Sequence, residues 1–122
     1  MYKDLLIISA IMLVLDYFYL KAISPLFNKM FIEIQGESIK INYLAAAMCY
    51  SLLVFALYYF IVKDKKPLLD AFLLGVVIYG IYDTTNMATI KNWQWNAVAV
   101  DTIWGGILMT ITYFLTKKLN IN

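Results

Sequence analysis

Long apolar runs separated by short polar segments divide the chain into four parts. A helix needs about 20 mostly apolar residues to cross the hydrocarbon core of a bilayer. The pattern therefore predicts an all-α membrane protein in which four transmembrane helices form one compact bundle, a single domain over residues 1–122. The predicted spans are about 5–23, 43–62, 68–88 and 98–115, the third reaching 88 only if its helix continues past Tyr82.

The polar segment between the first two spans, residues 24–42, has a pattern of its own. Pro25 is suited to the first turn of a helix, and apolar residues follow it at helical spacing. These are Leu26, Phe27, Met30, Phe31 and Ile34. The spacing predicts a short amphipathic helix at the membrane interface, ending near Gly36. An ordered apolar loop packed on the bundle is the alternative interpretation.

Composition supports the membrane assignment and removes several functions. The 122 residues are 63% hydrophobic, against about 45–50% in a soluble domain. The chain has no histidine and no arginine, so the commonest general base and the bidentate phosphate clamp are both missing. A net charge of +2 gives no basis for nucleic-acid binding. The lone Cys49 excludes an intrachain disulfide and fits an apolar filler, and nothing calls for a cofactor.

The lysines predict which side of the membrane the termini occupy, because cytoplasmic loops carry an excess of basic residues. Four spans place both termini and the second loop on one side, with six lysines against four on the other side. The six are Lys3, Lys63, Lys65, Lys66, Lys117 and Lys118, and the four are Lys21, Lys29, Lys40 and Lys91. We therefore predict that both termini are cytoplasmic.

Three aspartates, Asp16, Asp83 and Asp101, lie inside or at the rim of apolar spans. A carboxylate at the centre of a membrane helix costs about 2.5–3.5 kcal/mol even on lenient scales, so it needs a partner or a purpose. The first and third spans run outward and the fourth runs inward. All three aspartates therefore converge on the non-cytoplasmic side, although they are scattered in sequence.

Other polar and aromatic side chains cluster near these acids. The stretch from Tyr82 to Trp93 reads YDTTNMATIKNW, and Met12, Asp16 and Tyr19 share one face of the first span. The sequence predicts a polar pocket in which these residues face Asp101 and Trp104 of the fourth span.

 The full predicted set is Asp16, Tyr19, Tyr82, Asp83, Asn86, Lys91, Asp101 and Trp104. Because carboxylate, amide and hydroxyl oxygens suit hard cations, the three aspartates are the candidate cation ligands. At least one carboxyl should carry a proton or a cation, and no catalytic residue is predicted.

Simpler interpretations of the same residues remain open. Asp83 can cap a broken third helix, and Asp101 can cap the start of the fourth span, where the positive helix end favours an anion. Lys91 can neutralise one of the acids in a purely structural network. Trp93, Trp95 and Trp104 fit an aromatic belt at the membrane interface, or one of them lines the pocket.

Small residues predict close helix packing. Two pairs lie four residues apart, Ala47 with Ser51 and Ala71 with Gly75, and the fourth span contains the pair Gly105 and Gly106. This pattern indicates packing and carries no chemistry.

The motif Y-D-x-T-N-x-A-T-x-K-x-W, followed by D-x-x-W-G and preceded by a mid-helix aspartate, resembles the DUF2177 family of small four-helix membrane proteins. The motif falls on Tyr82, Asp83, Thr85, Asn86, Ala88, Thr89, Lys91, Trp93, Asp101, Trp104 and Gly105, with Asp16 upstream. The resemblance covers essentially the whole chain and implies a four-span, inner-membrane type of architecture, in bacteria or some large viruses. It implies no activity, and the segment 24–42 is where departure from the family is expected.

Three functions compete. The first is a pocket that binds or conducts a cation, a proton or a small polar ligand, where transport would need a homo-oligomer because four spans show no internal repeat. The second is a structural or scaffolding role in a viral or cell envelope. The third is a membrane enzyme with paired carboxylates as acid and base, disfavoured because no nucleophile–base pair is evident.

Overall fold

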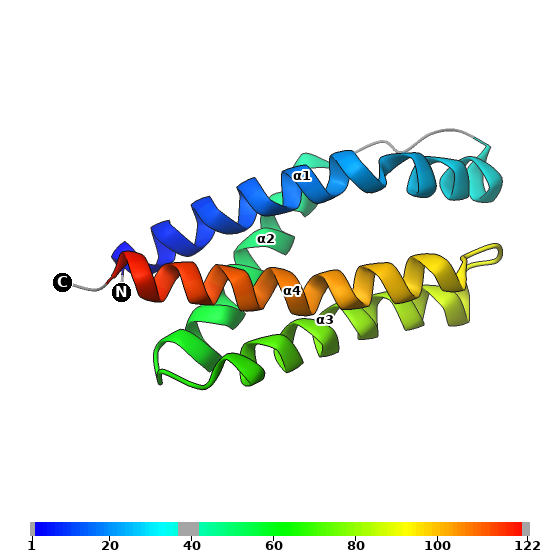
Figure 1. The fold of residues 1–122 in the computed structure, drawn as a ribbon. Helices are drawn as coiled ribbons and strands as arrows, with labels where there is room; N and C mark the ends of the chain where they lie inside the picture. The colour runs from blue at the N-terminus through cyan, green and yellow to red at the C-terminus, as the bar shows by residue number, and fades with distance from the viewer. Residues whose placement is uncertain (1, 37–41, 121–122) are drawn as a thin grey trace.

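In a computed structural model, which describes residues 2–36 and 42–120, the chain forms a bundle of long helices (Figure 1). The elements are α1 (Tyr2–Gln35), α2 (Tyr43–Leu57), a π-helical turn η1 (Tyr58–Val62), α3 (Leu68–Thr89) and α4 (Trp95–Leu119). In the described part of the chain, four helices are long and apolar enough to cross a membrane, with α2 and η1 together making the second. The four-span helical bundle predicted from the sequence is confirmed.

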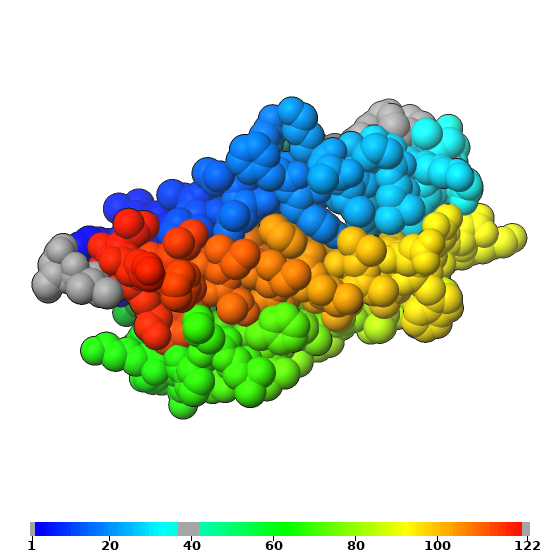
Figure 2. Space-filling view, viewed as in Figure 1, coloured from blue at the N-terminus to red at the C-terminus, as the bar shows by residue number. Residues whose placement is uncertain are grey.

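Both termini lie at the same end of the bundle, and the turn between α3 and α4 lies at the other (Figure 1). We call the end with the α3–α4 turn the distal end. Helix α4 is the central helix: ten of its residues are buried, against three or four in each of the other three. On one face of the molecule α4 is flanked by α1 and α3 (Figure 2).

Helix α1 continues through Pro25 and does not break before a separate interfacial helix. Proline lacks an amide hydrogen, so the Lys21 carbonyl loses its helical partner. The Ser24 hydroxyl donates to that carbonyl at 3.4 Å instead. The predicted helical stretch after Pro25 is present, but as the last part of a 34-residue helix. Residues 37–41 of the predicted loop, including Lys40, lie outside the described residues.

The last part of α1 packs on the bundle through aromatic side chains. Trp93 is buried, and its ring meets Phe27 and Phe31 edge-on, with centroids 6.5 and 5.7 Å away. Met30 is fully buried in the same cluster. At about 1.5 Å per residue, α1 is longer than the hydrocarbon core is thick. This contact therefore fixes the projecting end of α1 over the start of α4.

Helices α3 and α4 approach so closely that side chains are excluded from their contact. A Cβ atom at Gly75 would meet the carbonyl of Gly105 and fall 2.9 Å from the Cα of Gly106. A Cβ at Gly106 would fall 2.7 Å from the ring of Phe72. The packing predicted for Ala71, Gly75 and the glycine pair is confirmed. The predicted packing of Ala47 and Ser51 is wrong, because both residues are exposed on α2.

An apolar layer fills the middle of the bundle. Ile8, Met12, Leu57, Leu108 and Met109 are fully buried and form one cluster. Met12 precedes Asp16 by one helical turn, and Leu108 follows Asp101 by about two turns. The layer therefore lies between the three aspartates and the end of the bundle that carries the termini.

Candidate functional site

The three aspartates are all buried, with exposed fractions of 6% for Asp16, 0% for Asp83 and 8% for Asp101. They come from α1, α3 and α4, and they act on one another electrostatically through Asp101. Their predicted convergence at one end of the bundle is confirmed. Each carboxyl, however, has a different set of partners.

Asp16 is held by two donors, one on each carboxyl oxygen. The Trp104 indole donates to Oδ1 at 2.9 Å, and the Tyr50 hydroxyl donates to Oδ2. Tyr50 belongs to α2 and Trp104 to α4, so this single carboxyl joins three helices. A buried carboxylate with a donor on each oxygen is well compensated for its loss of water.

Asp101 is joined to the same network by an aromatic link. The Tyr19 hydroxyl donates to Asp101 Oδ1 at 3.0 Å, and the Tyr19 ring stacks on Trp104 with centroids 4.6 Å apart and an interplanar angle of 3°. Tyr19 therefore binds one acid through its hydroxyl and supports the donor of the other through its ring. The connected series is Tyr50, Asp16, Trp104, Tyr19 and Asp101.

Asp83 lacks such support. Both of its oxygens are buried, and neither has a partner in good hydrogen-bond geometry among the described residues. Its polar neighbours are the Asp101 carboxyl and the Trp93 indole, whose buried N–H does not reach Asp83 in good hydrogen-bond geometry. A bare carboxylate beside a second carboxylate in a low-dielectric setting is strongly unfavourable. A protonated Asp83 would instead be able to donate a hydrogen bond to Asp101.

The capping interpretations are wrong for Asp83 and Asp101. Helix α3 continues to Thr89, so Asp83 lies inside it, and α4 begins at Trp95, so Asp101 lies in its second turn. Gln94 occupies the cap position of α4. Both acids lie within helices because backbone amides at membrane depth are best satisfied by a continuous helix.

The remaining predicted site residues lie toward the edge of the cluster. Tyr82 is exposed by 55%, and its ring meets Trp93 edge-on at 6.3 Å. Asn86 is half-buried beside Tyr82. Lys91 is exposed in the α3–α4 turn, and it forms no ion pair with any described carboxylate. The structure therefore gives Lys91 no role in neutralising Asp83.

The three tryptophans differ from one another. Trp104 is half-buried against the acids, and Trp93 is buried in the distal aromatic cluster. Trp95 is exposed by 66%, as a residue of an interfacial belt would be.

No three histidine, cysteine, aspartate or glutamate side chains among residues 2–36 and 42–120 lie close enough to hold one metal ion. Asp16, Asp83 and Asp101 therefore do not form a joint metal site. The remaining candidate cation site is the pair Asp83 and Asp101, because both oxygens of Asp16 already accept hydrogen bonds from Tyr50 and Trp104.

The sequence prediction missed two tyrosines. Tyr50 donates to Asp16, and Tyr79 is half-buried in the field of Asp16 and Asp101. Both lie inside apolar spans, where a tyrosine hydroxyl needs a partner just as a carboxyl does. This need for a hydrogen-bond partner could have identified both tyrosines from the sequence. The structure also explains why residue 105 is a glycine, because a Cβ at this position would enter the Tyr79 ring.

Residues 1–117 match the family model described as predicted membrane protein DUF2177. The chain belongs to this family. No curated protein and no solved structure matches the chain in the same comparisons. The family description agrees with the four membrane-spanning helices and names no activity.

Proposed function

We propose that the distal acidic cluster binds a proton or a small cation between Asp83 and Asp101. The observation that carries this proposal is the Asp83 carboxyl, which is fully buried, has no well-formed hydrogen bond on either oxygen and interacts with a second acid. A shared proton or a bound cation removes the repulsion between the two carboxylates. Asp16, with its two donors, has a positioning role in this proposal and holds α1, α2 and α4 around the pair.

Binding is favoured over conduction by a single chain. Ile8, Met12, Leu108 and Met109 are fully buried and make the middle layer of the bundle apolar. An ion crossing that layer would lose its water without gaining oxygen ligands. A homo-oligomer remains the arrangement in which the family could transport an ion.

A structural role is the second candidate, and the Asp16 contacts favour it. One carboxyl bonded to α2 and α4 ties three helices together without any ligand. The two candidates differ in what they predict for Asp83. A structural link through Asp16 needs no proton or cation at Asp83, whereas a binding site does.

The test is the thermal stability of the purified protein in detergent, measured from pH 8 to pH 5 and with sodium, calcium or choline chloride at matched ionic strength. We expect stability to rise as the pH falls or when Na⁺ or Ca²⁺ replaces choline, because each change relieves repulsion between the two acids. Asp83→Asn removes one charge, keeps the shape and should abolish most of that response. Asp64→Asn, in the exposed α2–α3 turn, is the matched control.

A wild-type protein whose stability changes with neither pH nor cation would contradict the binding site. The double variant Asp83→Asn with Lys91→Met then separates the alternatives. Rescue by the lysine change would reveal a structural ion pair, whereas the exposed position of Lys91 leads us to expect no rescue.

We also propose that both termini are cytoplasmic, which places the distal end and its acids on the far side of a bacterial inner membrane or of a viral or host membrane. The lysine bias supports this orientation. A reporter that is active only in the cytoplasm, fused after Asn122, should be active. A consistently external signal would reverse the orientation and leave the convergence of the acids unchanged.

A further inference from the structure

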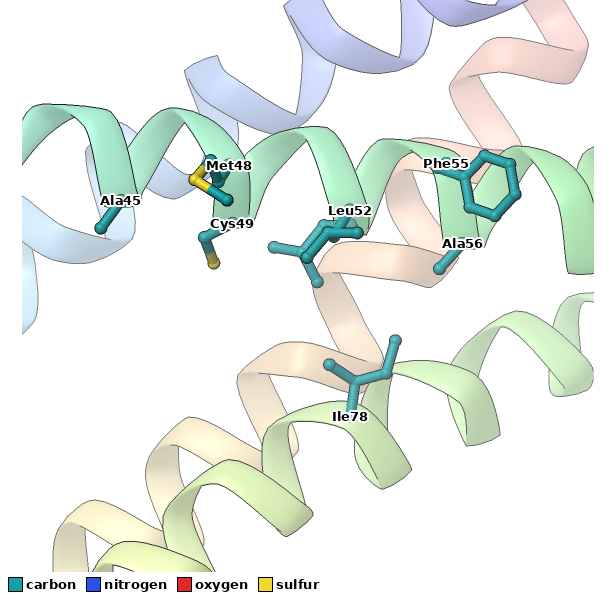
Figure 3. Close-up of a pocket in the computed structure, with 8 residues that line it drawn as sticks. Ala45, Met48, Cys49, Leu52, Phe55, Ala56 and Ile78 are labelled. Carbon is teal, nitrogen blue, oxygen red and sulfur yellow. The ribbon is translucent and has the colours of Figure 1, made fainter.

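An open apolar groove of about 640 Å³ separates α2 from α3. Ala45, Cys49, Leu52 and Ala56 line it from α2, and Ile78 lines it from α3 (Figure 3). The groove lies between two helices that are long and apolar enough to span a membrane, and its walls are apolar, so they suit an alkyl chain.

The groove passes beside the acidic cluster. Cys49 precedes Tyr50, which donates to Asp16, and the Cys49 side chain lies in the field of that acid. On the opposite wall Ile78 is followed by Tyr79, which lies in the electrostatic field of Asp16 and Asp101. Tyr79 therefore adjoins the groove wall at Ile78, and Asp83 follows it by one helical turn on the same side of α3.

Tyr79 has an unused hydroxyl at this junction. No described residue donates a hydrogen bond to it or accepts one from it, although it lies in the electrostatic field of two carboxyls. Its ring occupies the space left by the missing side chain of Gly105, which fixes the ring across α4. A phenol held in this way can receive a polar head group that enters along the groove.

We infer that the distal cluster takes an amphiphile from the membrane, with a cationic ammonium head near the acids and an alkyl tail in the α2–α3 groove. This inference rests on the proposed function and names its ligand class. The head must be cationic, because Asp16, Asp83 and Asp101 are acidic and no basic side chain is among the groups that act on Asp16 or Asp83. The tail must be apolar, because the groove walls offer almost no polar surface.

The experiment uses the full chain in phosphatidylcholine nanodiscs, with three probes at equal concentration: hexadecylamine, hexadecanol and ethylamine. We expect hexadecylamine to raise the melting temperature by several degrees. Hexadecanol, which has only the tail, and ethylamine, which has only the head, should each produce less than half of that shift.

Variants assign the effect to the groove. Leu52→Trp fills the groove and should abolish the hexadecylamine shift, and Ala45→Trp provides a second block if the first variant does not fold. Leu44→Trp is the matched control, because Leu44 is 73% exposed on α2 and does not line the groove. Tyr79→Phe keeps the ring and removes the hydroxyl, and it should lower the apparent affinity for hexadecylamine about tenfold.

Equal shifts in wild type and Leu52→Trp would overturn the inference by showing a general membrane effect. Equal shifts with hexadecylamine and ethylamine would overturn it by showing that the tail plays no part. The response to pH, Na⁺ and Ca²⁺ without amphiphile is measured in the same nanodiscs. If that response is present while the tail has no effect, the inference fails and the proposed function stands; if that response is absent, the proposed function fails as well.

Discussion

The two flanks of helix α3 are built in opposite ways. On one flank Gly75 lies against the backbone of Gly105 and Gly106 in α4, with no room for a side chain. On the other flank an open apolar groove separates α3 from α2. The same helix therefore has one tightly packed neighbour and one loosely packed neighbour.

This difference suits a binding site better than a scaffold. The close α3–α4 contact fixes the positions of Asp83 and Asp101 relative to each other, because the helix backbones touch where Gly75 meets Gly105 and Gly106. Helix α2 is joined to the acids by the Tyr50–Asp16 hydrogen bond. A rigid pair of acids beside a less tightly held helix is an arrangement that admits a ligand without disturbing the pair.

The largest expected effect comes from adding one methyl group to the tight flank. Gly75→Ala places a Cβ atom against the Gly105 carbonyl and within 2.9 Å of the Gly106 Cα, so the backbones must separate. Overpacking of this kind costs about 1–3 kcal/mol or more. We expect a markedly lower melting temperature in detergent, together with a weaker response to pH, because Asp83 and Asp101 move apart.

Gly80→Ala is the control on the same helix. Its Cβ would lie 3.5 Å from Thr102 Cγ2, which is an ordinary contact. Alanine is favoured over glycine in a helix by up to about 1 kcal/mol, so this variant should be neutral or slightly stabilised. Equal destabilisation by the two variants would mean that the glycine contact between α3 and α4 is not the rigid element.

Much of this arrangement was predictable from the sequence because a few general rules of membrane proteins determine it. Apolar runs of span length must form helices in a bilayer, and antiparallel neighbours bring Asp16, Asp83 and Asp101 to one end. Gly75 and Gly105 indicate close packing because small residues let helix backbones approach each other, whichever helix is the neighbour. Pro25 misled the prediction, since a proline that usually begins a helix is tolerated where the Ser24 hydroxyl takes over the freed carbonyl.

The detailed partners of the acids were not predictable. Tyr50 and Lys91 show why, because hydrogen-bond partners depend on how far each helix is rotated about its axis. Lys91 follows Asp83 by two helical turns but lies in the exposed turn. Tyr50 has no sequence relation to Asp16 and meets it only through the packing of α2 on α1.

A smaller effect is expected from the polar link of α2. Tyr50→Phe removes the donor to Asp16 Oδ2 and leaves the ring in place. Hydrogen bonds between membrane helices contribute about 0.6 kcal/mol on average and about 1.7 at most, so we expect a loss of about 1 kcal/mol. Tyr43→Phe, at a tyrosine that is 78% exposed, is the control and should change nothing. The measurement is reversible unfolding in mixed detergent, and a loss as large as that of Gly75→Ala would show that α2 is held as firmly as α4.

The smallest effect is expected on the loose flank, from Leu52→Trp without any amphiphile. Leu52 is 67% exposed and lines the groove, so an indole there meets open space. Substitutions at such surface positions usually stay within about 0.5 kcal/mol. Leu57→Ala on the same helix is the contrast, because Leu57 is fully buried and its truncation should cost about 2 kcal/mol or more.

Leu52→Trp and Gly75→Ala together test the asymmetry of α3 directly. If a whole indole fits beside α3 on the α2 flank at little cost, while one methyl group on the α4 flank is destabilising, then the space between α2 and α3 is available to a ligand. If Leu52→Trp is instead as destabilising as Leu57→Ala, then α2 closes on α3 in the membrane. The acids would then have no lateral entrance, and only a proton or a small ion arriving from the distal end would reach them.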